Sequence, residues 1–213
     1  MPSSDPPSTS VALQEHVFYC FDVLHAYLSS RGDDSQTISP RFPSPSEPYA
    51  IFVTWNTLRS GKEPRLRGCI GNFKPAPLAD QLAQYAIISA TEDGRFTPVR
   101  LSKLPDLGCG ISILTPFEAC KDPLDWEIGT HGIYITFRHP HTKRTLTATY
   151  LPQIASEQGW SKIETLQSAV HKAGFNGDLD QVWQPDQEST LSVQRYRSEK
   201  AEASWAEWQA ARA

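Results

Sequence analysis

Apolar residues recur every three or four positions in three stretches of the chain, the spacing of one face of an α-helix. The first stretch, residues 11–30, predicts an amphipathic helix with Ser10 as its N-cap. The second predicts a helix that begins after Pro77 and ends at about Asp93. The third begins at the capping-box sequence Ser161-Lys162-Ile163-Glu164 and predicts a helix that reaches Gly174.

Strands are predicted where apolar and polar side chains alternate. The alternation is clearest in Tyr49–Thr57, which is rich in aromatic and β-branched residues and places Trp55 on the same side as Ile51 and Val53. Further strands are predicted at 66–73, 107–115, 132–138, 144–151 and 191–196. These strands come in neighbouring pairs and do not alternate with helices. The pattern therefore predicts an α+β fold with an antiparallel or mixed sheet, and it argues against a dinucleotide-binding fold.

The ends of the chain differ in composition from its middle. Residues 1–10 are rich in Pro and Ser and predict a disordered lead, followed by one domain over 11–197. Residues 198–213 predict a weakly helical tail that packs little. The lead has no basic or apolar part of a secretory signal, and no apolar run reaches the roughly 20 residues that span a bilayer. We therefore expect a protein of the cytoplasm, the nucleus or both, not secreted and not in a membrane.

Charge and cysteine content exclude several classes of protein. The net charge is −4, so binding of nucleic acid, which the sequence leaves open, would need a local basic patch. The four cysteines are Cys20, Cys69, Cys109 and Cys120. Their spacing contains no C-x-x-C pair, which argues against a disulfide framework and against a structural zinc site. No glycine-rich phosphate-binding motif occurs either, so no cofactor and no metal are predicted.

The segment Leu66–Gly71, with the sequence LRGCIG, carries the strongest candidate chemistry. In a regular strand, Leu66 and Ile70 would point to the core, while Arg67 and Cys69 would point together to the other face. A guanidinium beside a thiol favours the thiolate, which is the reactive form of cysteine. This arrangement predicts a nucleophilic Cys69 with Arg67 as an anion-binding neighbour. The alternative is that Cys69 is a small buried apolar side chain.

Gly68 and Gly71 flank this cysteine. Glycine weakens a strand, but it is useful where a ligand or another backbone must come close. We therefore predict that both residues contribute to a substrate-binding floor, with a simple β-bulge as the alternative.

Four motifs together resemble the AMMECR protein family, in the order in which that family has them. LRGCIG at 66–71 is similar to the signature hexapeptide of the family. Asp93–Pro98, Glu127–Gly132 and the region Leu151–Gly174 resemble its further conserved stretches. The resemblance covers roughly residues 11–197.

The resemblance implies an antiparallel-rich sheet flanked by helices, with a smaller lobe beside it. Prokaryotic members of the family are fused to, or encoded beside, Memo-like and radical-SAM proteins, which implies a partner in an enzymatic pathway. Eukaryotic members are intracellular and partly nuclear. The same context implies a substrate related to nucleotides or RNA. The resemblance names no reaction, and it leaves the oligomeric state open.

Four further residues are candidates for the site. His131 is a candidate general base, with a histidine held by a turn as the alternative. Glu127 is a candidate acid or a group that orients His131, and its alternative is an ordinary turn carboxylate. Arg95 is predicted to bind an anionic group or to pair with Glu92 or Asp93. Gln153 is predicted to offer amide contacts to a substrate or to cap a helix.

Two hypotheses about function follow. In the first, the protein is a thiol-dependent enzyme with Cys69, His131 and Glu127 as catalytic residues and with Arg67 and Arg95 holding an anionic substrate. In the second, it is a non-catalytic binding or scaffold domain for a protein or RNA partner. The sequence leaves both open and favours the enzyme slightly.

Overall fold

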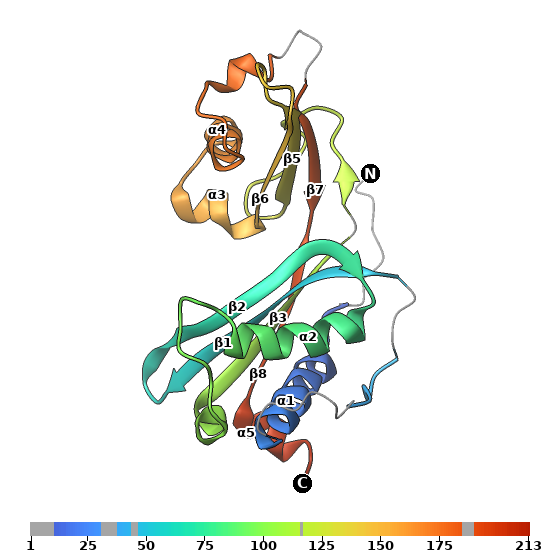
Figure 1. Ribbon diagram of the computed structural model, residues 1–213, viewed down its shortest axis with the longest axis vertical. Helices are drawn as coiled ribbons and strands as arrows, with labels where there is room; N and C mark the ends of the chain where they lie inside the picture. The colour runs from blue at the N-terminus through green and yellow to red at the C-terminus, as the bar shows by residue number, and fades with distance from the viewer. Residues whose placement is uncertain (1–10, 31–37, 44–46, 116, 185–189) are drawn as a thin grey trace, which may run out of the picture. The chain divides into compact units, whose positions relative to one another are not determined.

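The computed structural model describes residues 11–30, 38–43, 47–115, 117–184 and 190–213. The chain forms two compact units: a larger unit of residues 1–114 and 199–213, and a smaller unit of residues 115–198. Each unit contains one four-stranded sheet with helices (Figure 1). This arrangement confirms the predicted α+β class with an antiparallel-rich sheet and a smaller lobe. The predicted lead, including Ser10, lies outside the described residues.

The sheet of the larger unit has the strand order β2-β1-β3-β8. Its strands are β1 (Tyr49–Arg59), β2 (Lys62–Ala76), β3 (Leu107–Leu114) and β8 (Ser198–Ser204). Helices α1 (Gln14–Ser29) and α2 (Leu78–Thr91) pack on one face of the sheet, and the 3-10 helix η1 (Leu101–Asp106) precedes β3 (Figure 1). Helix α1 begins three residues inside the predicted range, where the ring nitrogen Nδ1 of His16 accepts the N–H of Leu13 at 3.2 Å.

The alternation in β1 sets the core of this unit, as the sequence predicted. Ile51, Val53 and Trp55 are fully buried against the helices. The indole N–H of Trp55 donates to the carbonyl oxygen of Ala86 in α2 at 3.0 Å, so its polar group is satisfied inside the core. Phe21 of α1 packs edge-on against the Trp55 ring, with 5.0 Å between ring centroids.

The C-terminal residues differ from the predicted loose tail. Ser198–Ser204 is strand β8 of the larger sheet, and Trp205–Ala210 forms the short helix α5. Trp205 and Trp208 are 9% and 8% exposed. The Trp208 indole donates to Asp22 of α1 at 3.1 Å, and Arg212 forms an ion pair with the same carboxylate. Two large aromatic side chains bury enough apolar surface to hold a helix of 6 residues, which is too short to be stable in isolation.

The sheet of the smaller unit has the order β4-β7-β5-β6. Its strands are β4 (Glu118–Ala119), β5 (Gly132–Arg138), β6 (Thr145–Tyr150) and β7 (Ser192–Tyr196). Its helices are α3 (Pro152–Gln158), α4 (Lys162–Lys172) and the 3-10 helix η2 (Leu179–Gln181). The predicted capping box is confirmed, since the Ser161 hydroxyl accepts from the N–H of Glu164 while the Glu164 carboxylate accepts from the N–H of Ser161. None of the helices in the described residues is long and apolar enough to cross a membrane.

Candidate functional site

A β-bulge interrupts β2 within the LRGCIG segment. Trp55 of β1 is opposite Gly68, but the next residue, Asn56, is opposite Leu66, so Arg67 is the extra residue. The bulge resets the alternation of side chains. Leu66, which the sequence places in the core, is therefore 37% exposed, and that prediction is wrong. A one-residue insertion in a strand cannot be read from the apolar pattern of that strand alone.

Gly68 and Gly71 occupy positions where other backbone atoms come very close. A Cβ atom on Gly68 would lie 1.8 Å from the carbonyl oxygen of Ser89 in α2. A Cβ atom on Gly71 would lie 2.0 Å from the carbonyl oxygen of Ile51 in the neighbouring strand. Both glycines thus allow close packing within the protein.

The segment after α2 binds the backbone of Cys69. In the strand order, β2 lies at an edge of the sheet, where backbone groups lack a partner strand. The Asp93 carboxylate accepts the N–H of Cys69 at 3.0 Å, and the Arg95 guanidinium donates to the Cys69 carbonyl oxygen at 3.1 Å. Asp93 and Arg95 also form a bidentate ion pair, with N–O distances of 2.9 and 2.7 Å. The Asp93–Arg95 pair therefore replaces a missing strand at Cys69.

This geometry explains the electrostatics of Asp93. Its side chain is buried, at 6% exposure, while that of Arg95 is 59% exposed. The hydrogen bonds from the Arg95 guanidinium hold the pKa of the Asp93 carboxyl well below its usual range, and the N–H of Cys69 acts in the same direction. Of the two roles predicted for Arg95, pairing with Asp93 is therefore observed.

Arg67 binds the same segment further along the chain. Its guanidinium donates to the Thr97 hydroxyl at 3.1 Å and to the Pro98 carbonyl oxygen at 3.4 Å. The two motifs that the sequence singled out, 66–71 and 93–98, are thus joined at Cys69 and at Arg67. These two bonds hold the Arg67 guanidinium against the 93–98 segment.

The Cys69 side chain is half-buried and has a polar neighbour on the adjacent strand. Thr54 of β1 is directly opposite Cys69, and its hydroxyl donates to the sulfur at 3.0 Å. The thiol therefore has a donor in place, although that donor is a threonine hydroxyl.

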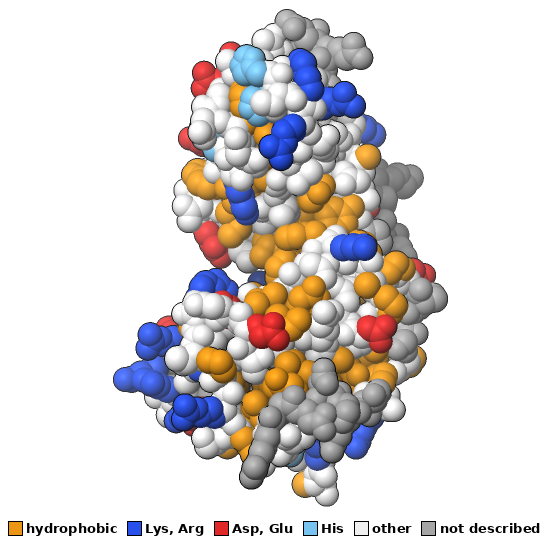
Figure 2. Space-filling view, viewed as in Figure 1, with side chains coloured by type: hydrophobic (Ala, Val, Ile, Leu, Met, Phe, Trp, Pro, Cys, Tyr) orange, Lys and Arg blue, Asp and Glu red, His pale blue; other side chains and the backbone are white. Residues whose placement is uncertain are grey.

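Arg67 and Arg95 both line a groove in the larger unit with a volume of about 690 Å³. One side of the groove comes from the β1–β2 hairpin and the other from the segment 95–107. Five basic residues line it: Arg59, Arg65, Arg67, Arg95 and Lys103. Figure 2 shows Lys and Arg side chains gathered on the part of the larger unit where this hairpin lies. We refer to this hollow as the cationic groove.

The groove keeps a positive charge after its acidic neighbours are counted. Asp106 lines the groove and pairs with Lys103 at 3.5 Å, and Asp93 neutralises Arg95. Three arginines remain, so the net-negative chain holds a local basic patch of the kind that the sequence analysis required. Three of these basic residues, Arg59, Arg65 and Lys103, were not predicted from the sequence. The density of basic residues in the hairpin segment 59–67 was a signal that could have identified two of them.

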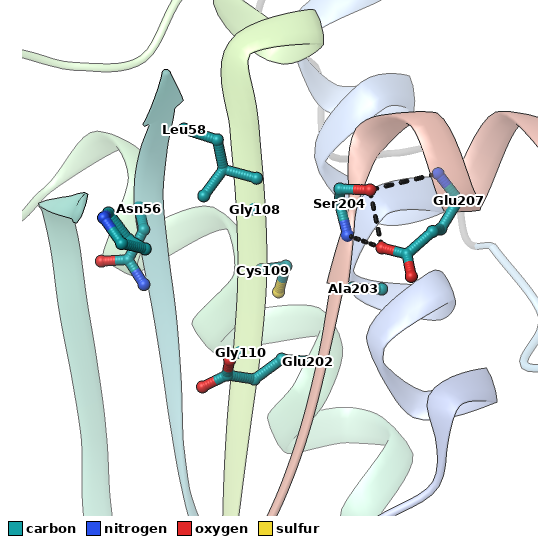
Figure 3. A pocket seen from close by; sticks show the side chains of 10 residues that line it. Asn56, Leu58, Gly108, Cys109, Gly110, Glu202, Ala203, Ser204 and Glu207 are labelled. Carbon is teal, nitrogen blue, oxygen red and sulfur yellow. Dashed lines mark hydrogen bonds between the residues drawn. The ribbon is translucent and has the colours of Figure 1, made fainter. Parts of the chain in front are cut away.

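A second hollow in the larger unit has the opposite charge. It has a volume of about 220 Å³, and its floor includes Gly108 and Gly110 of β3. The side chain of Glu202 lies across Gly110 (Figure 3). Glu207 also lines this hollow, but its carboxylate accepts from the N–H and the hydroxyl of Ser204 at the start of α5. Of the two hollows, the cationic groove is therefore the one suited to anions.

The remaining predicted residues belong to the smaller unit. The Nδ1 atom of His131 accepts the backbone N–H of Glu127 at 3.1 Å, so the neutral ring carries its proton on Nε2. Burial, together with Arg197 and Arg195, lowers the pKa of His131 below its ordinary value. The Glu127 side chain is exposed, and Gln153 lies half-buried in the first turn of α3.

The described residues contain no group of three or more His, Cys, Asp or Glu side chains that could hold a metal ion.

Comparison with known proteins identifies the family of the chain. The AMMECR1 family model matches residues 17–201, which include both joined motifs and strand β8 up to Ala201. The chain belongs to the AMMECR1 family. The two segments that meet at Cys69 and line the cationic groove therefore lie within the part of the chain that AMMECR1 proteins share.

Relatives of this AMMECR1 chain occur in plants, fungi and archaea. An uncharacterized protein of Arabidopsis thaliana is 40% identical over 187 residues, which are 88% of this chain and 83% of that protein. An uncharacterized protein of Saccharomyces cerevisiae is 33% identical over 215 residues, covering 90% and 86% of the two chains. The crystal structure of an uncharacterized protein from Pyrococcus horikoshii matches with a TM-score of 0.63 at 27% identity, over 88% of this chain and 89% of that one.

Proposed function

We propose that this AMMECR1 protein binds a small anionic ligand in the cationic groove of its larger unit. The observation that supports the proposal most directly is the concentration of five basic residues around one hollow in a chain of net charge −4. A hollow lined by one sign of charge raises the local concentration of ions of the opposite sign. Arg67 and Arg95 then act as ligand-binding residues, together with Arg59, Arg65 and Lys103.

The groove suits a ligand related to nucleotides, the class that the family resemblance implies. Arginine forks bind phosphate oxygens in pairs, and Thr57 and Thr97 add hydroxyl groups to the lining. Anion binding by Arg67 and Arg95 is the part of the enzyme hypothesis that requires no chemistry at Cys69. The location in the cytoplasm or nucleus and a Memo-like or radical-SAM pathway partner are further proposals that rest on the family resemblance.

Binding at the groove has a direct test in Arg65→Gln, which removes one exposed cation from its rim. We expect isothermal titration calorimetry with ADP to give a dissociation constant that is about tenfold larger for Arg65→Gln than for the wild type. The matched control is Arg138→Gln at the end of β5, which removes an exposed charge from the smaller unit and should leave the constant unchanged. Equal weakening in both variants would show that only the total charge matters and would contradict the proposal.

A second candidate function is thiol chemistry at Cys69, which the Thr54 hydroxyl bond favours. Arg95 lines the groove and also donates to the Cys69 carbonyl, so the thiol-bearing strand and the groove share one residue. In this candidate, Cys69 is the nucleophile of an enzyme. His131 and Glu127 stay proposed as acid/base residues of the smaller unit, and Gln153 as a ligand contact.

Alkylation by iodoacetamide at rising pH, followed by mass spectrometry of the folded protein, tests this candidate. We expect Cys69 to react before Cys120, because the surroundings of Cys120 disfavour its thiolate. Burial and the nearby Asp125 raise the pKa of Cys120 to about 11, and its thiol donates to the Asp125 carbonyl. Cys20 and Cys109 are buried and serve as a check that the fold is intact. If Cys69 is as slow as Cys120, the thiol is structural and anion binding alone remains.

A further inference from the structure

The cationic groove has an apolar part that an inorganic anion would not use. Leu58, Leu66, Phe96 and Leu107 line it together with the arginines. Leu66 is one of the few large apolar side chains of the described residues that are substantially exposed. The bulge at Arg67 places it there, in a strand whose regular alternation would have turned it away. A half-buried leucine, Leu58, and a half-buried aromatic ring, Phe96, share this lining.

The charged part of the groove carries more than one free positive charge. Ion pairs with Asp106 and Asp93 neutralise Lys103 and Arg95. Among the described residues, Arg59, Arg65 and Arg67 have no carboxylate partner. Arg67 donates to two neutral oxygens, which leaves its charge uncompensated. A single carboxylate would neutralise one of three charges. A phosphate monoester carries close to two negative charges at neutral pH and three oxygens that accept hydrogen bonds from arginine forks.

We infer that the ligand of the cationic groove is a phosphate monoester attached to a flat apolar or aromatic body. The inference rests on the proposed anion binding and names the class of ligand. The phosphate lies among Arg59, Arg65 and Arg67, and the apolar body covers Leu66 and Phe96. The Lys103–Asp106 and Arg95–Asp93 pairs add no net charge, so the three remaining arginine charges favour a compact anionic group over an extended polyanion.

Three probes separate the two parts of this ligand: phenyl phosphate, inorganic phosphate and benzoate. In titration calorimetry of the whole protein at neutral pH, we expect phenyl phosphate to bind about tenfold more tightly than either of the others. From about pH 5 to about pH 7.5, binding of phenyl phosphate should strengthen as its second proton leaves. Benzoate, which keeps one charge over this range, should show no such change.

Leu66→Ser tests the apolar part without removing charge. Because Leu66 is partly exposed, the variant should fold, as circular dichroism checks. We expect this variant to bind phenyl phosphate about tenfold more weakly than the wild type and to bind inorganic phosphate with unchanged affinity. Arg65→Gln should weaken the binding of both ligands. Equal affinity for benzoate and phenyl phosphate, or an equal loss for both phosphates in Leu66→Ser, would overturn the inference.

Two other outcomes distinguish this inference from the proposed function. If none of the three anions and no nucleotide binds to the folded wild type, anion binding itself is wrong. If a short single-stranded RNA binds more tightly than phenyl phosphate and does not respond to Leu66→Ser, the groove binds a polyanion. The inferred ligand class is then wrong, while the proposed anion binding stands.

Discussion

Gly68→Ala is expected to destabilise the protein by at least about 3 kcal/mol. The new Cβ atom would lie 1.8 Å from the Ser89 carbonyl oxygen, a distance at which one of the two backbones must move. Ser89 is fully buried in α2, and that helix packs on the same sheet. Movement of the helix would therefore open the core around Trp55, and rigid, closely packed interiors resist such shifts.

Urea unfolding and thermal melting measure this effect. The matched control is Gly94→Ala, because a Cβ atom on Gly94 meets nothing within 4 Å and its backbone is compatible with alanine. Gly94→Ala should change the free energy of unfolding by less than about 1 kcal/mol and is expected to stabilise slightly. If Gly68→Ala is as stable as Gly94→Ala, the close approach of α2 to β2 is incorrect.

Asp93→Asn is expected to lower the free energy of unfolding by about 2 kcal/mol at neutral pH. The amide oxygen can still accept the N–H of Cys69, but the charged bidentate bonds with Arg95 are lost. Arg95 would then lose its main partner at the edge of β2. Arg95 stays in the cationic groove, and its charge is no longer neutralised by Asp93. The affinity of the groove for anions should therefore stay equal or rise.

The effect of this variant should depend on pH in a direction that the pKa of Asp93 sets. The Arg95 guanidinium lowers the pKa of the folded carboxyl, so the ion pair stabilises the fold fully above the unfolded pKa of about 4. As the pH falls below that value toward the folded pKa, this contribution is lost. The difference in stability between wild type and Asp93→Asn should therefore shrink between about pH 5 and about pH 2. A difference that is constant over this range would contradict the ion pair.

The sequence predicted well those elements whose apolar pattern is local and regular. Strand β3 lies within the predicted range 107–115, and its alternate residues Leu107, Cys109, Ile111 and Ile113 are all buried. The capping box at Ser161 was also predicted, because both of its partners lie within one turn of α4. Strand β8 was missed, since its sequence lacks the alternation typical of strands and it forms by pairing at the edge of a sheet.

By itself, the sequence determined the α+β class, the family motifs and the residue types of the candidate site. Only the tertiary structure decided which contacts those residues make. The bulge at Arg67 turned Leu66 outward, and the bonds of Asp93 and Arg95 to Cys69 joined two motifs that are more than twenty residues apart. The cationic groove likewise combines the hairpin 59–67 with the segment 95–107. Side-chain periodicity reports on one element at a time, whereas a site depends on contacts between elements that are distant in the chain.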